Sequence, residues 1–180
     1  MRRARRLVSI GMLVVVWARP VAAQAIQVTP LQRGGQVLVS FTLVDGFDEG
    51  VRAAMHSGLP TSFTYEVELR RAAALWVDRT MASATVTATV KYDNLTRRYQ
   101  VSRTIDGRLE AEPQVTDSED LVGTLVTVFD KLALFATADL EANAEYYLKV
   151  SARTSPRSTW FLWPWGRHSA SGRATFTFIP

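Results

Sequence analysis

The chain has 180 residues, no cysteine and a formal net charge of +4. The absence of cysteine excludes disulfides, thiolate nucleophiles, thiolate metal sites and covalently attached haem. Five of the 21 basic residues and none of the 17 acidic residues lie in the first 23 positions, so the other 157 residues carry 16 basic and 17 acidic side chains. A basic domain is the usual mark of nucleic-acid binding. Because the excess positive charge belongs to the N-terminal segment, we expect no nucleic-acid partner.

The N-terminal segment has the three parts of a secretory signal peptide. Residues 1–6 include four arginines, residues 7–18 form a run of 12 uncharged residues, and Val21-Ala22-Ala23 provides small residues for cleavage. A membrane-spanning helix needs about 20 apolar residues, and this run is too short. We therefore predict a signal peptide over residues 1–23, cleaved after Ala23, with Ala25 as the second choice. The protein is then exported, and it is periplasmic or envelope-associated.

Alternation of apolar and polar residues dominates residues 24–180. Each alternating run turns one face to a core and the other to water, which is typical of antiparallel sheets. The apolar positions of these runs are Val37, Val39, Phe41 and Leu43; Phe63, Tyr65, Val67 and Leu69; Val86, Ala88, Val90 and Tyr92; Tyr99, Val101 and Ile105; Leu148, Val150 and Ala152; and Ala174, Phe176 and Phe178. The turns between runs contain Gly34-Gly35, Asp93-Asn94 and Asp106-Gly107. About five to eight such strands predict a mainly β fold, an immunoglobulin-like antiparallel β-sandwich, as a single domain over residues 24–180.

Two helices are expected to interrupt the strands. The first covers residues 48–57, with Gly58 as its stop signal and Pro60 just beyond. The second begins near Thr116, which has the spacing of a capping box with Glu119. Acidic residues suit the positive end of this helix, namely Asp117, Glu119 and Asp120. Spacings of three and four then form an apolar stripe of Leu121, Leu125, Val128, Phe129 and Leu132.

We expect the second helix to run through Leu132 and to pack its stripe on the sheets. A partner-binding amphipathic helix is the alternative.

Several short motifs resemble a known bacterial family. They are Gly58-Leu59-Pro60, residues 63–71, Trp76-Val77-Asp78, Val90-Lys91-Tyr92, residues 95–99 and residues 146–153. Together they are similar to the signature of the family called domain of unknown function 4390 (DUF4390), over roughly residues 28–180. The resemblance implies an exported bacterial envelope protein with a link to envelope signalling. The family carries no established activity, so the resemblance transfers no functional residue.

Structural roles are assigned to Gly58, Pro60, Trp76 and Asp78. We expect Trp76 to anchor the core, because a large aromatic ring contributes a large buried apolar surface. We expect Asp78 to pair with Arg70, Arg71 or Arg79 at a strand junction.

Candidate catalytic or metal-binding residues are few: His56 and His168, the acidic cluster Asp45, Asp48 and Glu49, and the pair Glu66 and Glu68. A histidine at a helix end interacts with helix carbonyls. The acidic cluster lacks the spacing of an EF-hand loop, and Asp48 suits a helix N-cap. Two acids on the polar face of an alternating strand are typical of a solvated surface. We therefore expect no catalytic residues, no cofactor and no metal site.

An aromatic segment at residues 158–168 is the strongest local signal. Its apolar side chains are Trp160, Phe161, Leu162, Trp163 and Trp165, flanked by Arg157 and Arg167. Prolines and a glycine predict a loop between two strands. One interpretation is a hydrophobic flap that closes one end of the sandwich. The other is an exposed docking loop, because tryptophan suits both membrane interfaces and protein interfaces, and arginine suits anionic headgroups.

The leading hypothesis from the sequence is a non-enzymatic binding or adaptor domain of the envelope. It docks on an envelope protein or a membrane surface through Trp160, Phe161, Leu162, Trp163, Trp165, Arg157 and Arg167. Two alternatives are a hydrolase or carbohydrate-active enzyme built on a β-sandwich, and a small-ligand or lipid carrier with a cavity between the sheets.

Overall fold

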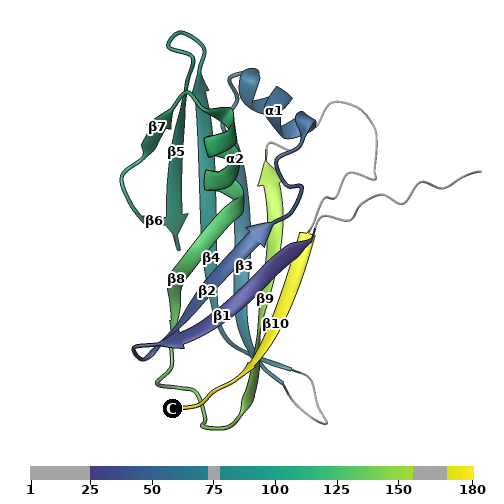
Figure 1. Ribbon diagram of the computed structural model, residues 1–180, viewed down its shortest axis with the longest axis vertical. Helices are drawn as coiled ribbons and strands as arrows, with labels where there is room; N and C mark the ends of the chain where they lie inside the picture. Colours follow the sequence, from purple (N-terminus) through teal and green to yellow (C-terminus); the bar gives the residue numbers. More distant parts are fainter. Residues whose placement is uncertain (1–24, 73–77, 156–169) are drawn as a thin grey trace, which may run out of the picture.

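A computed structural model describes residues 25–72, 78–155 and 170–180 (Figure 1). In chain order the elements are β1 (Ile26–Arg33), β2 (Gln36–Leu43), α1 (Glu49–His56), β3 (Thr61–Arg71), β4 (Arg79–Asp93), β5 (Arg98–Ile105), β6 (Arg108–Leu109), β7 (Gln114–Thr116), α2 (Glu119–Thr127), β8 (Val128–Ala136), β9 (Glu145–Ser155) and β10 (Ala170–Thr177).

The strands form two antiparallel sheets that face each other. The smaller sheet has the order β1-β2-β8, and the larger has the order β10-β9-β3-β4-β5-β6 with β7 paired to β5. The smaller sheet covers the lower part of the larger one, and α1 and α2 cover the upper part (Figure 1). The predicted antiparallel β-sandwich with two helices is confirmed. The immunoglobulin-like topology in particular is not confirmed by these strand orders.

The core lies between the two layers, where the alternating runs predicted it. The four apolar positions of β2 and the four of β3 are all buried. Three rings meet at the centre: Phe41 lies 5.0 Å from Tyr65 and 4.7 Å from Phe129, measured between ring centroids. The hydroxyl of Tyr65 donates a hydrogen bond of 2.6 Å to the carbonyl of Val126, so this buried polar group is satisfied.

The two layers also touch along one side, where β1 lies beside β10. A parallel bridge joins Ala25 to Ser171. A Cβ atom at Gly172 would lie 2.0 Å from the carbonyl oxygen of Ile26, so glycine is required for this close approach.

The first helix agrees with its prediction at both ends. The carboxylate of Asp48 accepts a hydrogen bond of 2.9 Å from the backbone N–H of Val51, as an N-cap does. The helix ends at His56, and Gly58 follows with a φ of +79°. Glycine is favoured in this left-handed conformation because it has no Cβ.

The second helix is shorter than its apolar spacing predicted. Its N-cap is Ser118 and not Thr116, because Thr116 belongs to β7 and its hydroxyl accepts a hydrogen bond from the N–H of Ser118. The helix ends at Thr127, and its buried face carries Val122 and Val126 in place of the expected stripe.

The other residues of the expected stripe, Val128, Phe129 and Leu132, belong to β8, where bulges give buried residues the spacing of a helix. The register with β2 shifts twice along β8, and Phe129, Leu132 and Phe135 are the buried residues of the strand. A regular strand buries every second residue, but an extra residue in a bulge makes the spacing three. Lys131, with a φ of +49°, lies in the first irregular stretch, and its N–H donates to the hydroxyl of Ser40.

Candidate docking surface

The strand register brings three connections together at one end of the larger sheet. Thr61, the first residue of β3, pairs with Val90 near the end of β4, and Ser62 pairs with Ser155 at the end of β9. We call this region the α1 end. It comprises α1, residues 57–60, the β4–β5 turn at residues 94–97, and Ser155, and it forms the upper part of Figure 1.

Helix α1 is fixed to this end by one buried anchor and by Glu119. The side chain of Met55 is completely buried in the core. Arg52 Nε lies 2.9 Å from one carboxylate oxygen of Glu119, and His56 Nε2 lies 3.4 Å from the other. Because Glu119 is in the first turn of α2, these contacts connect the two helices. The His56 ring also packs edge-on against Tyr92, at 5.1 Å between centroids.

The β4–β5 turn is held in one conformation by Asp93. The carboxylate of Asp93 accepts hydrogen bonds from the N–H groups of Leu95, at 2.8 Å, and Thr96, at 3.3 Å. The hydrogen bonds to the backbone of Leu95, and then those to Thr96, hold the pKa of Asp93 below its usual range, because they favour the charged carboxylate. Arg97 completes the turn with a φ of +55°.

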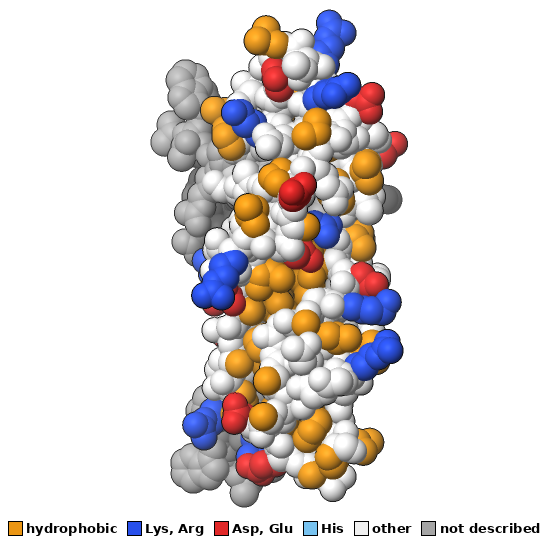
Figure 2. Space-filling view, turned by 90° about the vertical axis from the view of Figure 1, so that its left-hand side faces the viewer, with side chains coloured by type: hydrophobic (Ala, Val, Ile, Leu, Met, Phe, Trp, Pro, Cys, Tyr) orange, Lys and Arg blue, Asp and Glu red, His pale blue; other side chains and the backbone are white. Residues whose placement is uncertain are grey.

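Apolar and basic side chains share the exposed surface of the α1 end. Leu59 is 54% exposed, and Leu95, in the turn, is 95% exposed. Lys91, Arg97 and Arg98 are also exposed, while the one acid of this hairpin, Asp93, is engaged with the turn backbone. Figure 2 shows apolar and basic side chains close together at this tip, with acidic side chains beside them.

The predicted docking segment lies between the end of β9 and the start of β10 in the chain. Trp160, Phe161, Leu162, Trp163, Trp165, Arg157 and Arg167 lie outside the described residues. Ser155, which precedes the segment, pairs with Ser62 at the start of β3. Ala170, which follows it, pairs with Ala152, three residues before Ser155. The residue before the aromatic segment is therefore at the α1 end, and the residue that follows the segment lies beside Ala152, further along β9.

The residues with predicted structural roles occupy different places. Gly58 follows the end of α1, and a Cβ there would lie 3.0 Å from the side-chain amide of Asn94. Pro60 is exposed and directly precedes β3, and Trp76 lies outside the described residues. Asp78 interacts with β3, because Arg70 donates a hydrogen bond of 3.1 Å to its backbone carbonyl.

The carboxylate of Asp78 has a partner that the sequence did not indicate. The hydroxyl of Tyr147 donates to Asp78 Oδ2 over 2.7 Å, and this hydrogen bond raises the pKa of Tyr147. Arg173 stacks on the same tyrosine ring at 3.6 Å. Arg71 was another candidate partner of Asp78. It instead donates two hydrogen bonds to the carboxylate of Glu141, at 2.5 and 2.6 Å.

The remaining candidate catalytic residues are not brought together in the described part of the chain. Glu66 lies 3.8 Å from Arg153, and Glu68 lies 3.5 Å from Lys149, on the face of the larger sheet away from the core. His56 instead contacts Glu119 at the α1 end. Within the described ranges, no group of three or more histidines and carboxylates is placed to hold a metal ion. Neither described helix has the length and apolar character needed to cross a membrane.

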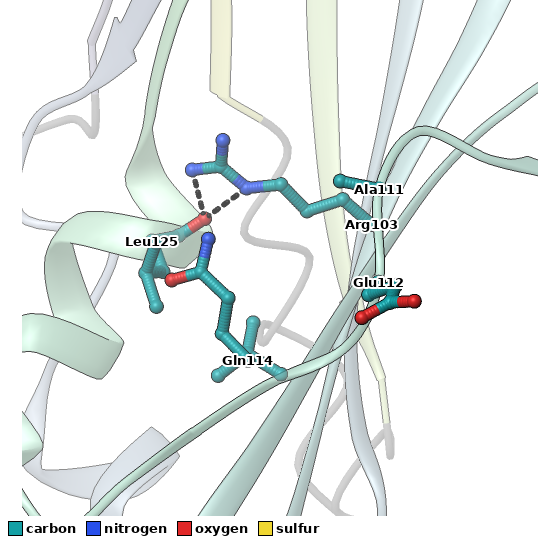
Figure 3. A pocket seen from close by; sticks show the side chains of 6 residues that line it. Arg103, Ala111, Glu112, Gln114 and Leu125 are labelled. Atoms are coloured by element: carbon teal, nitrogen blue, oxygen red, sulfur yellow. Dashed lines mark hydrogen bonds between the residues drawn. The ribbon is translucent and has the colours of Figure 1, made fainter.

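A recess between β5 and α2 is a feature that the sequence analysis missed (Figure 3). Arg103 donates from Nε and Nη2 to the carbonyl of Leu125, at 2.9 and 2.5 Å, and from Nη2 to the carbonyl of Val128, at 2.9 Å. Its guanidinium lies 4.5 Å from the ring centroid of Phe129, and burial lowers its pKa.

This recess supports the fold and has no room for an organic ligand. Its space of about 20 Å³ suits a single water molecule. Arg103 satisfies carbonyls at the C-terminal end of α2, where a helix leaves such groups unpaired. The signal was present in the sequence, because Arg103 occupies an inward position of the run that contains Tyr99, Val101 and Ile105.

Comparison with known protein families gives a match over most of the chain. The family model described as Domain of unknown function (DUF4390) matches residues 20–158. This range covers β1 to β9 and ends at the first residue of the aromatic segment, so β10 lies beyond it. No curated protein matches the chain at a significant level, and neither does any solved structure.

Proposed function

The chain belongs to the family described as Domain of unknown function (DUF4390), and from this premise we propose that it is an exported, non-enzymatic binding domain of the bacterial envelope. It docks on a membrane surface through its α1 end and the aromatic segment attached there. A role as an adaptor in envelope signalling agrees with this position.

One observation carries the proposal. The tryptophan-containing segment follows Ser155, at the end of the sandwich that also exposes Leu59, Leu95 and basic side chains. Tryptophan rings favour the membrane–water interface, and basic residues near the surface attract anionic headgroups. The composition of the segment and that of the α1 end therefore both favour contact with an anionic membrane surface.

The start of the fold supports export. Strand β1 begins at Ile26, just after the predicted cleavage site at Ala23. Cleavage there would leave every described strand intact. The absence of cysteine is also compatible with an oxidising compartment, since a domain of about 150 residues can be stabilised by apolar burial without disulfides.

The packed interior favours binding at the surface over carriage of a ligand between the sheets. The rings of Phe41, Tyr65 and Phe129 fill the centre at separations of 4.7 to 5.1 Å between centroids. A lipid carrier needs an open cavity at this position, because a bound ligand is largely enclosed by the protein.

The proposal is tested by liposome flotation of the purified protein. We compare the wild type with a Trp163→Ala, Trp165→Ala double variant. The control variant carries Leu31→Ala and Ile179→Ala, two exposed apolar residues at the opposite end of the molecule. We expect the wild type and the control to float with the vesicles and the tryptophan variant to stay largely in solution. Absence of flotation by the wild type refutes docking on a membrane, and pull-downs with the same variants then test a protein surface as the target.

A further inference from the structure

We infer that the β4–β5 turn is a second membrane-contacting element, in which Leu95 inserts among the lipids while Lys91, Arg97 and Arg98 contact anionic phosphate headgroups. This inference rests on the proposed docking at a membrane, and it assigns a role to described residues outside the aromatic segment.

The conformation of the turn presents Leu95 outward. Its side chain is 95% exposed, although a leucine is among the residues most often buried in folded proteins. The turn is not loose at this point, because the carboxylate of Asp93 accepts hydrogen bonds from the N–H groups of both Leu95 and Thr96. Asn94 in turn lies against Gly58 of the α1–β3 connection. The leucine is therefore displayed by a preorganised turn, so insertion costs little further ordering.

The charges around Leu95 suit an anionic surface. Lys91, Arg97 and Arg98 lie on the same hairpin and are all exposed. Their opposing charge, on Asp93, is directed at the turn backbone. Two acids of the neighbouring helices contact a basic side chain, since Arg52 lies 3.6 Å from Glu49 and 2.9 Å from Glu119, while Asp120 of α2 is exposed.

A lipid surface fits this tip better than a protein partner does. A stable protein interface buries more than about 1,000 Å² and surrounds its anchors with a packed rim. The β4–β5 turn is a narrow projection at the end of the molecule (Figure 1), so its own contact area is small. Membrane binding instead combines weak signals, an inserted apolar group with a few basic residues, and a second element such as the aromatic segment makes the attachment stable.

The test measures partitioning of the purified protein between buffer and two kinds of vesicle, phosphatidylcholine alone and phosphatidylcholine mixed with phosphatidylglycerol. The first variant is Leu95→Ser. The second carries Arg97→Asn and Arg98→Gln, where asparagine tolerates the positive φ of position 97. The matched controls are Leu109→Ser and Arg108→Gln, because Leu109 is 61% exposed on β6, away from the α1 end.

We expect Leu95→Ser to lower the partition coefficient about tenfold on both vesicle types, as the loss of one inserted leucine implies. The double variant at positions 97 and 98 is expected to lower it about tenfold or more on the anionic vesicles only, and this effect should disappear at high salt. Both controls should bind like the wild type. Thermal unfolding of all variants should match the wild type, because the substituted side chains are exposed.

The outcomes separate this inference from the proposed function. If the wild type does not bind vesicles, both are wrong. If it binds and Leu95→Ser binds equally well, the turn does not insert, and the inference alone is overturned. If Leu95→Ser loses binding while the tryptophan variant binds fully, the β4–β5 turn contacts the membrane and the aromatic segment does not. An arginine effect of equal size on both vesicle types overturns the assignment of anionic headgroups.

Discussion

Replacement of Arg103 by methionine is expected to destabilise the protein by about 3 kcal/mol, because hydrogen bonds with charged groups contribute roughly 1.5–3 kcal/mol and stranded carbonyls add a desolvation cost. The arginine makes three hydrogen bonds to two carbonyls at the end of α2, those of Leu125 and Val128. It also lies over the ring of Phe129. Methionine keeps much of the apolar stem but offers no donor. Water has partial access to the recess, so the carbonyls left without a donor are not fully desolvated. The expected loss of stability therefore stays at about this level.

The measurement is urea unfolding followed by circular dichroism, with Arg108→Met as the control. Arg108 is exposed on β6, so its replacement should change the free energy of unfolding by less than about 0.5 kcal/mol. In thermal scans, a loss of 3 kcal/mol lowers the Tm by about 6–12 °C for a chain of this size. Arg103→Lys should fall between the two, because a single ammonium lacks the planar fork that donates to both carbonyls. If Arg103→Met unfolds like Arg108→Met, the carbonyls at the end of α2 do not depend on this arginine and the reasoning fails.

Three further predictions concern the contact between β1 and β10, the hydrogen bond between Tyr147 and Asp78, and the β4–β5 turn. Gly172→Ala places a Cβ 2.0 Å from the carbonyl oxygen of Ile26 and should destabilise the protein by about 2 kcal/mol in urea unfolding, whereas Gly50→Ala in α1 should be neutral or slightly stabilising. Tyr147→Phe removes the hydrogen bond to Asp78 Oδ2 and should cost about 1 kcal/mol; an unchanged free energy of unfolding would show that this bond adds nothing to stability. The pKa of Asp93 is lowered in the folded protein, so its contribution is complete above the ordinary aspartate pKa and is lost as pH falls through the lowered value. After correction for the intrinsic exchange rate, the protection of the Leu95 and Thr96 amides should therefore fall as the pH drops through this value, and Asp93→Asn should remove this pH-dependent loss of protection.

Most strands could be predicted from the sequence because burial of one sheet face leaves a direct trace in the order of residues. The alternating positions of β3, from Phe63 to Leu69, are all buried in the structure. The first helix was equally accessible, since Asp48 and Gly58 mark its ends by local chemistry that needs no tertiary information. Where local signals and the burial pattern agree, a single sequence is sufficient to predict the helix or strand.

The failure at α2 and β8 shows where burial patterns become ambiguous. A spacing of three between Phe129, Leu132 and Phe135 is produced equally by one face of a helix and by a strand with bulges. Only the pairing with β2 distinguishes the two, and pairing partners are not encoded locally. The same reasoning explains Arg103, whose inward register was visible although the carbonyls that it serves, on α2, were not.

The proposed docking surface depends on register even more strongly than the core does. The pairs Thr61–Val90 and Ser62–Ser155 place Leu59, Leu95 and the start of the aromatic segment at one end of the sheet, although they are separated by tens of residues along the chain. The sequence indicated the aromatic segment because its composition is unusual. It did not indicate Leu95, since a single leucine in a turn is common and becomes informative only when its exposure and its neighbours are known. When a binding surface is assembled from several turns, composition therefore reveals only the segment with the most unusual sequence. The other turns of the surface can be identified only when the strand pairing is known.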